Sequence, residues 1–509
     1  MRKATIVWTA AVLLLLGAAA ARGEEALCRL PLLPADQTPA APAGAVLLTA
    51  GGRPLAYDAA ANTYYIPAGE DQSLPAEITL DLPAGGRGWI TERGEDGAFD
   101  VYAFVDNGWQ MSHAVATALP VLAIDTEAGD LPSDETAGGS LRLFERAADG
   151  ALRVTASPLT IRLRGNTSRR FPKKSYRVTM VNERGKKQNV SIAGLRSDDD
   201  WILNPLYADS SKIREAVSYW LWETINSSGQ AAASSRLRYA EVVLNGEYYG
   251  LYGVQERVDR KQVGADRQQD ILYKVAANRQ PEVEELLAWA GDEPCQGIEL
   301  AFAGSRVLSP WAPAADYMAA LTSASSPGNA RFDRANVIDY GLWSMLTQAR
   351  DCHFKNQFIH GQWTAAGYIL YHMPWDLNHT LGDLWAGSAE AENYTSYEML
   401  PLVTDDLFQA VFDQNDPAFR QALKARWTAL RHGDVTEEAI LGYARGLFEA
   451  LYPAIARDSL RWPSCGMGEG NAANIRDIED YIRQALPRID AWVDALETEE
   501  ERHGQDLDR

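Results

Sequence analysis

The sequence predicts an α+β fold, in which a small all-β domain precedes a larger mixed domain that ends in helices. The chain has 509 residues with a hydrophobic fraction of 46%, enough for two or three domains with packed cores. Short alternating apolar runs, separated by Gly, Pro and Asp, fill residues 28–118. The last hundred residues instead repeat apolar positions at the i, i+3, i+4 spacing of helices.

The N-terminus has the organisation of a secretory signal peptide. Arg2 and Lys3 precede an apolar run from Ala4 to Leu16, and small residues follow it. We therefore expect residues 1–22 to be removed on export, and the mature protein to be secreted or held at the extracellular surface. The apolar run is shorter than a membrane span, so we expect no transmembrane anchor.

The net charge limits the possible partners, and the cysteines limit the possible disulfides and zinc sites. The formal net charge of -21 argues against nucleic acid, which calls for a basic surface. Export permits disulfides, and four cysteines allow three pairings, among which the sequence does not choose. Their spacing matches no zinc site. These cysteines are Cys28, Cys295, Cys352 and Cys465.

Residues 28–118 are predicted to form a β-sandwich. The runs AVLLTA, NTYYIPA, AEITLDL and DVYAFVD alternate in the manner of half-buried strands and are separated by turn residues. No group of acids or histidines in this region indicates catalysis. We therefore expect an accessory module that contacts the cell surface or a glycan.

A basic turn follows two predicted strands, Leu119–Asp125 and Ser140–Arg146. Further strands flank the turn RGNTSRRFP, which carries Arg164 and Asn166, and the second of them is expected to begin with Lys173 and Lys174. A strand lysine and the backbone amides of such a turn can bind phosphate. A basic turn that is simply solvated is the alternative reading.

A helix and a hairpin are predicted next. Asp209 or Ser210 can cap the helix, and Glu215 in its first turn is a candidate partner for the strand lysine, a better one than Glu223. A solvent-side acid is the simpler interpretation of Glu215. The stretch RYAEVVLNGEYYGLYGVQERVD then predicts two strands around an Asn-Gly turn, and Glu256 closes the second strand.

The most informative stretch surrounds two acids. A long helix, FDRANVIDYGLWSMLTQARD, is expected to lead directly into Asp351, and Asn356 follows five positions later. The runs 357–360 and 368–371, joined by the turn GQWTAAG, predict a hairpin, after which Asp376 appears. Protein kinases place their catalytic base, metal-binding Asn and metal-binding Asp in this order. Acids that cap turns would produce the same spacing.

Two further patterns complete the chain. His353, His360, His372 and His379 crowd the central stretch, but they form no H-x-x-x-H or other metal spacing, so a metal-dependent hydrolase that reuses the acids is a weaker hypothesis. Such a hydrolase would turn over without nucleotide. LFQAVF and residues 417–431, 437–456 and 475–496 are predicted to form helices, and residues 498–509 a charged, frayed tail.

Five segments in order resemble the CotH kinase family, bacterial secreted or spore-coat proteins with an atypical protein-kinase-like two-lobed fold. They are RGNTSRRFPKKSYRV, ADSSKIREAV, VVLNGEYYGLYGVQERVD, D-CHFK-N and WDLNHTLG. The resemblance implies a kinase-like domain over residues 119–497, with an N-lobe at 119–256 and a C-lobe at 257–497. It also implies transfer of the ATP γ-phosphoryl group, with Mg²⁺ or Mn²⁺, to Ser or other hydroxyls of exported proteins.

The resemblance also suggests residue roles. Asp351 would be the catalytic base, and Asn356 and Asp376 would be metal ligands. Lys174 would contact the nucleotide phosphates, with Lys173 as the second candidate by position. Arg164 and Asn166 would lie over the phosphates, and Glu256 would mark the crossing between lobes.

One departure from the family opens an alternative. The family commonly has a second acid two residues after the tryptophan-adjacent Asp, where this chain has Asn378, a metal ligand without charge. A catalytically weak relative, serving as a surface binding or assembly module, is therefore the alternative function. For the kinase, the acidic composition suggests basic, Ser-rich protein substrates.

Overall fold

The computed structural model describes residues 23–39, 44–276, 291–294, 297–316, 330–352, 355–383, 416–463 and 475–496. The chain divides into two compact units. The N-terminal unit comprises residues 1–163, 178–199 and 239–252, and the C-terminal unit comprises 164–177, 200–238 and 253–509. Several predicted features lie outside the described residues, namely the signal peptide, Cys295, His353, LFQAVF, Cys465 and the charged tail.

The described part of the N-terminal unit contains two antiparallel-rich sheets, which fulfil the expectation of an all-β region. One sheet has the strand order β1 (Gly23–Ala26), β6 (Ile78–Leu82), β2 (Leu47–Ala50), β3 (Arg53–Pro54). The other has the order β4 (Ala56–Asp58), β5 (Thr63–Pro67), β9 (Gly108–Thr117), β8 (Ala98–Val105), β7 (Arg87–Ile90). The four runs identified in the sequence correspond to β2, β5, β6 and β8.

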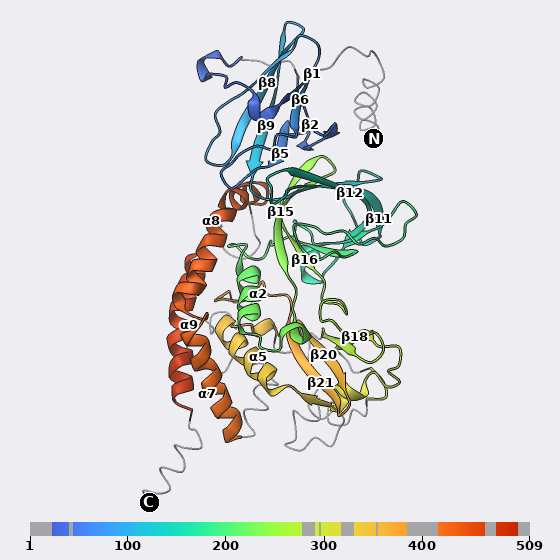
Figure 1. Ribbon diagram of the computed structural model, residues 1–509, viewed down its shortest axis with the longest axis vertical. Helices are drawn as coiled ribbons and strands as arrows, with labels where there is room; N and C mark the ends of the chain where they lie inside the picture. The colour runs from blue at the N-terminus through green and yellow to red at the C-terminus, as the bar shows by residue number, and fades with distance from the viewer. Residues whose placement is uncertain are drawn as a thin grey trace, which may run out of the picture. The chain divides into compact units, whose positions relative to one another are not determined.

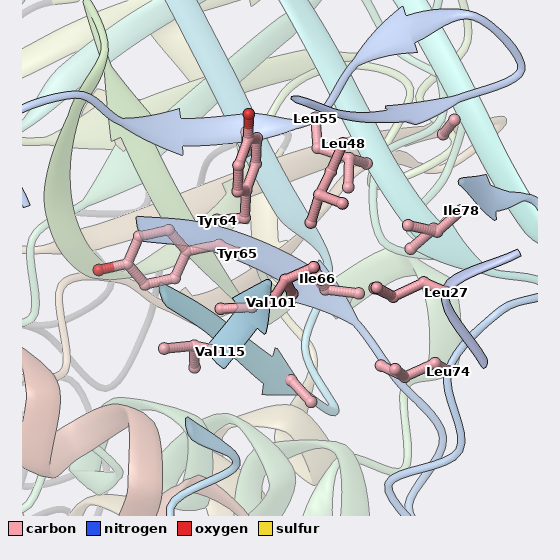
Figure 2. Close-up of a cluster of buried hydrophobic side chains, with 14 of the residues drawn as sticks. Leu27, Leu48, Leu55, Tyr64, Tyr65, Ile66, Leu74, Ile78, Val101 and Val115 are labelled. Atoms are coloured by element: carbon pink, nitrogen blue, oxygen red, sulfur yellow. The ribbon is translucent and has the colours of Figure 1, made fainter. Parts of the chain in front are cut away.

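A single hydrophobic core joins these two sheets. Leu48 and Ile78 come from the first sheet, and Ile66 and Val101 come from the second (Figure 2). Each strand places alternate side chains on opposite faces, so its apolar residues gather on the face that meets the other sheet. The same core includes Val121, from the strand that follows the two sheets.

Within the described residues, seven strands form a closed barrel. Their order is β10 (Val121–Thr126), β11 (Ala137–Arg146), β12 (Leu152–Leu163), β13 (Tyr176–Met180), β14 (Asp200–Asn204), β16 (Glu247–Glu256), β15 (Leu237–Leu244). The predicted hairpin is β15–β16, and Glu256 ends its second strand as expected. Asn245 (φ 53°) and Gly246 (φ 72°) adopt the left-handed conformation that a two-residue hairpin turn requires.

The predicted start of the strand after the basic turn is wrong. β13 begins at Tyr176, so Lys173 and Lys174 precede it. Pro172 has no N–H for a sheet, and the Arg164 N–H donates to the Ser175 carbonyl at 3.0 Å, which places the first pairing after the lysines. The intervening turn contains the short 3-10 helix η4 (Thr167–Arg170).

The C-terminal unit combines a sheet with helices. Its described strands follow the order β18 (Ile298–Ala303), β17 (Ile271–Val275), β20 (Gln357–Thr364), β21 (Gly367–Pro374), β19 (Ala330–Phe332). Its helices are α2 (Arg214–Ile225), α5 (Arg334–Thr347), α7 (Pro417–His432), α8 (Glu437–Arg461) and α9 (Arg476–Asp494). The orange and red helices α7 and α8 both pack on α9, and α2 packs on α5 (Figure 1). The predicted helices at 417–431, 437–456 and 475–496 are confirmed.

The helix before Asp351 ends earlier than predicted. Asp333 caps its start by accepting the Asn336 N–H, and Gln348 adopts the left-handed conformation (φ 53°, ψ 46°) that ends α5 at Thr347. Asp351 therefore lies in a separate 3-10 turn, η6 (Arg350–Cys352).

The hairpin after Asp351 has a tighter turn than the predicted GQWTAAG. Strands β20 and β21 continue to Thr364 and Gly367, so that the turn is Ala365–Ala366. The Thr364 hydroxyl accepts the Ala366 N–H at 3.2 Å and donates to the Gly367 carbonyl at 2.6 Å. This local bonding lets the strands pair over their full length.

The parts of the chain that the structure describes contain no helix long and apolar enough to cross a membrane.

A buried group of charges attaches α8 to the basic turn. Asp458 on α8 accepts from the Lys173 ammonium at 2.6 Å, and the Lys212 ammonium lies 3.6 Å from its other oxygen. The side chains of Lys173 and Asp458 are fully buried. Because charges are costly to remove from water, each partner here depends on the others.

We predict that Asp458→Ala strongly destabilises the C-terminal unit. The variant leaves two buried ammonium groups without their carboxylate, a change that typically costs about 3–5 kcal/mol. The control is Lys187→Ala, which removes the exposed partner of Asp199 and should cost about 0–1 kcal/mol. Urea unfolding measures both, and equal small losses would contradict the structural role of Asp458.

Candidate functional site

Asp351 and Asn356 lie in direct contact. The Asn356 side-chain amide donates to Asp351 Oδ2 at 2.7 Å, and the Lys355 ammonium lies 2.9 Å from Asp351 Oδ1. Asn356 adopts a left-handed backbone (φ 56°), which asparagine tolerates better than most residues. Because the amide nitrogen bonds to Asp351, the amide oxygen is the end available to a cation.

The β20–β21 hairpin brings Asp376 to this pair. The Trp375 N–H donates to the Asn356 carbonyl at 2.9 Å, which closes the open end of the hairpin. Asp376 follows immediately, is exposed and also has a left-handed backbone (φ 63°). Left-handed non-glycine residues are uncommon and often occur at functional sites. The three residues predicted from spacing therefore lie at one end of one hairpin.

Arg164 belongs to the same site. Its guanidinium carbon lies 6.0 Å from the centre of the Trp375 ring. Burial lowers the pKa of Arg164, and the negative charges of Asp376 and Glu215 partly counteract that effect. The arginine therefore provides a positive charge near the acids. Asn166, in the same turn, is exposed.

Glu215 is a buried acid beside Arg164. Its carboxylate accepts from the Asn204 amide at 2.6 Å and the Gln255 amide at 2.8 Å. Burial and the charge of Asp376 raise its pKa to about 7, although the two amides and Arg164 lower it. The expected ion pair of Glu215 with a strand lysine is wrong, since the carboxylate bonds to these amides instead.

The two candidate lysines lie in different surroundings. Lys173 is fully buried against Asp458, so its ammonium is not accessible to a ligand in this arrangement. Lys174 is partly buried, and its ammonium donates to the Arg169 carbonyl at 2.7 Å. Of the two, only Lys174 can reach a ligand in solvent.

The remaining predicted positions are Glu256 and Asn378. Glu256 is buried at the end of β16, where its carbonyl accepts from the Ser235 hydroxyl at 2.7 Å. Asn378 is partly buried, two residues after Asp376. The lobe-crossing role of Glu256 and the metal-ligand role of Asn378 stay predictions.

The described histidines of the central stretch differ in their contacts, and two of them differ in the direction of their pKa shifts. His372 is buried, bonds to the Gln357 side chain at 3.0 Å, and has its pKa lowered to about 3 by burial. His360 lies 3.4 Å from Asp270. Burial lowers the pKa of His379, but Asp383, Asp351 and Asp376 raise it further, so that the pKa is raised overall.

The donor set suits magnesium better than zinc. No group of three or more His, Cys, Asp or Glu side chains among the described residues is arranged to hold a metal ion. Magnesium, however, commonly uses one or two carboxylates together with substrate phosphates. Asp376 and the Asn356 amide oxygen supply hard oxygen ligands of that kind, so the residues present fit a nucleotide-bound divalent cation.

Some residues of the site were not predicted from sequence. Lys355 could have been noticed, because it lies within D-CHFK-N, four positions from Asp351. Tyr219 lies one helical turn after Glu215 on α2, and its hydroxyl accepts from the Gln255 amide at 3.1 Å. His379 gave no sequence signal that distinguishes it from the other histidines.

We predict that Glu215 makes stability depend on pH. Its folded pKa of about 7 exceeds the ordinary 4.5, so its stabilising contribution is full below pH 4.5 and is lost as pH rises through 7. The shift corresponds to about 3 kcal/mol. Unfolding free energies measured from pH 4 to 8 should therefore fall less steeply for Glu215→Gln than for the wild type. The control Glu223→Gln, an exposed acid on the same helix, should follow the wild-type curve.

The family comparison covers the residues of this site. A family model described as CotH kinase protein matches residues 161–487, which include Arg164, Glu215, Asp351, Asn356 and Asp376. No curated protein matches the chain. The match spans more than half of the 509 residues and confirms the resemblance noted in the sequence. The chain therefore belongs to the CotH kinase protein family.

Proposed function

We propose that this protein is an exported atypical protein kinase with a two-lobed kinase-like fold. It transfers the ATP γ-phosphoryl group to Ser or other hydroxyls of secreted or surface proteins. The observation that carries the proposal is the contact of Asp351 with Asn356, joined through one hairpin to Asp376 and facing a positive charge on Arg164. Phosphoryl transfer needs this combination of a base, oxygen ligands and a cation.

Asp351 acts as the base in this proposal. Asn356 and Lys355 each hold one of its oxygens and so fix the orientation of the carboxylate. As the acceptor hydroxyl attacks phosphorus, its proton passes to Asp351 and the bond to the ADP leaving group breaks. The Lys355 ammonium lies where it can also offset negative charge on the transferred group.

Asp376 and Asn356 would hold the divalent cation, with Asn378 as a further ligand. Mg²⁺ or Mn²⁺, when bound, would neutralise phosphate charge and polarise the phosphoryl group that is transferred. Asp376 supplies a full negative charge from an exposed position, whereas the two amides supply neutral oxygens.

Arg164 is proposed as the main cation for the nucleotide phosphates. It lies near Asp376, and the buried Glu215 beside it can orient the guanidinium. A guanidinium binds phosphate through two parallel hydrogen bonds, which a lysine cannot provide. Lys174, the position suggested by the resemblance, remains the competing candidate, and Lys173 instead supports the turn through Asp458.

The sequence supports the proposed location and substrate class. The signal-peptide pattern favours a secreted or cell-surface location, where the substrates would be other exported proteins. The net charge of -21 favours basic, Ser-rich acceptors through electrostatic steering. One observation supports a second candidate function: Asn378 lacks the charge of a second acid, as expected of a catalytically weak surface binding or assembly module.

We predict that Asp351→Ala and Asp376→Ala both impair transfer, but for different reasons. Loss of the base should lower the rate about 10²–10⁴-fold at any metal concentration. Loss of Asp376 should raise the metal concentration needed for activity. The measurement is incorporation of labelled phosphate from ATP into a basic Ser-rich protein with Mg²⁺ or Mn²⁺. The exposed acid Glu70 supplies the control, Glu70→Ala.

The outcomes separate the two functions. Unchanged transfer by Asp351→Ala would refute the assignment of the base. Nucleotide binding without transfer by the wild type would instead favour the binding module, and would indicate Asn378 as its cause.

We predict that Arg164→Ala weakens ATP binding more than Lys174→Ala does. Arg164 lies near the charge of Asp376, whereas the Lys174 ammonium is bonded to a carbonyl of its own turn. The loss of a charged hydrogen bond should raise KM for ATP at least about tenfold for Arg164→Ala. Initial rates over a range of ATP concentrations measure both, and the reverse order would restore Lys174 as the phosphate-binding residue.

A further inference from the structure

The outer face of β7, β8 and β9 carries an ordered set of side chains. In the register of these strands, Arg87 lies opposite Phe104, and Trp89 lies opposite Tyr102. On the other side of β8, Phe104 lies opposite Trp109, and Tyr102 lies opposite Met111. Opposite residues share a face of a sheet, as do residues two apart in one strand. All six side chains therefore lie on the same face.

Four aromatic rings on this face contact one another, and we call them the outer aromatic cluster. Trp109 is at its centre. The Trp109 ring centre lies 5.2 Å from that of Trp89 and 5.2 Å from that of Phe104, and the Tyr102 ring meets Trp109 edge-on at 6.2 Å. Such tilted and edge-on contacts hold rings in defined orientations.

The outer aromatic cluster is separate from the hydrophobic core. Val101 and Ala103, which alternate with Tyr102 and Phe104 along β8, point to the opposite face and belong to the core (Figure 2 labels Val101). None of the four rings is among the residues of that core. Trp89, Phe104 and Trp109 are half-buried and so partly accessible to a ligand, whereas Tyr102 is buried and serves to support the Trp109 ring that it contacts.

A polar row borders the rings. Asp100 lies opposite His113, and their side chains are joined by a 2.7 Å hydrogen bond. The Thr91 hydroxyl accepts the Asp100 N–H at 2.8 Å, which places Thr91 in the same row. At the other end of the face, Arg87 is exposed. Flat apolar surface and hydrogen-bonding groups thus lie side by side.

We propose that this face is a binding site for a neutral glycan. A pyranose ring has an apolar C–H face, which stacks on an aromatic ring, and hydroxyls at its edge, which bond to polar groups. The rings of the outer aromatic cluster and the row Thr91–Asp100–His113 supply these two requirements next to each other.

Size and charge argue against other occupants. The six side chains of this face and the row Thr91–Asp100–His113 together make nine positions. Neighbouring strands lie about 4.8 Å apart and same-face residues about 6.8 Å apart along each strand, so the nine positions cover about 300 Å². A stable protein partner needs about 800 Å² on each side, whereas two or three sugar rings fit this smaller area. The net charge of -21 disfavours nucleic acids and anionic lipid surfaces. The proposal stands independently of the kinase function.

The test is retention of the mature full-length protein on insoluble chitin and cellulose, with competition by the matching soluble oligosaccharides. The wild type should be retained on at least one of them and released by its oligosaccharide. Trp109→Ala should weaken binding at least about tenfold, as expected for a central aromatic contact, and Trp109→Phe should retain most of the affinity. The control Trp363→Ala removes a solvent-exposed tryptophan on β20, outside the N-terminal unit, and should bind as the wild type does.

Clear outcomes would overturn the proposal. These are the absence of retention on both polysaccharides, equal loss in Trp109→Ala and Trp363→Ala, or capture of a protein partner through Trp109 without glycan binding. Thermal unfolding checks that each variant is folded, which is expected because Trp109 lies outside the core. If Trp109→Ala does not fold, the retention of Trp89→Ala is compared with that of Trp109→Phe, the wild type and Trp363→Ala. Loss of retention in Trp89→Ala alone would then support the glycan site.

Discussion

The candidate site depends on the closure of one hairpin. The hydrogen bond from the Trp375 N–H to the Asn356 carbonyl continues the pairing of β20 and β21 to their open end. It sets Asn356 and Asp376 beside each other although twenty positions separate them in sequence. The same strand end places Asn356 against Asp351, whose own position follows from the left-handed Gln348 that ends α5. The proposed oxygen ligands, the proposed base and the end of α5 are thus connected through the backbone.

The degree of burial decides how strongly the charged side chains around this hairpin interact and which of them a ligand can reach. Glu215 is buried and Arg164 is partly buried, so each is sensitive to the charge of the other and to that of Asp376. Asp376 itself is exposed, as the proposed role of a cation ligand requires. Lys173 shows the opposite case: its ammonium is buried against Asp458, where it supports the basic turn. Neighbouring residues of similar type therefore have different functions because their surroundings differ.

In the N-terminal unit, neighbouring residues of one strand also have different surroundings, because they alternate between the two faces of the sheet. Along β8 one face supplies Val101 and Ala103 to the core, while the other supplies Tyr102 and Phe104 to the outer aromatic cluster. Stability and binding can then change independently, because they use opposite faces of one strand. If an exported kinase also binds a glycan, it would act on proteins at the surface that carries this glycan. The proposed kinase activity and the proposed glycan site together describe a surface-bound enzyme.

The sequence by itself determined the local elements and the identity of the acids. Alternating runs predicted the N-terminal strands, Asn245–Gly246 predicted the turn of a hairpin, and the order of Asp351, Asn356 and Asp376 indicated the site, because these signals are local. Only the tertiary structure decided which basic side chain meets the acids. Lys173, Lys174 and Arg164 lie within eleven residues and look equivalent in sequence. Their roles differ because Asp458 and Glu215, which pair with Lys173 or lie beside Arg164, come from distant helices that only folding brings near.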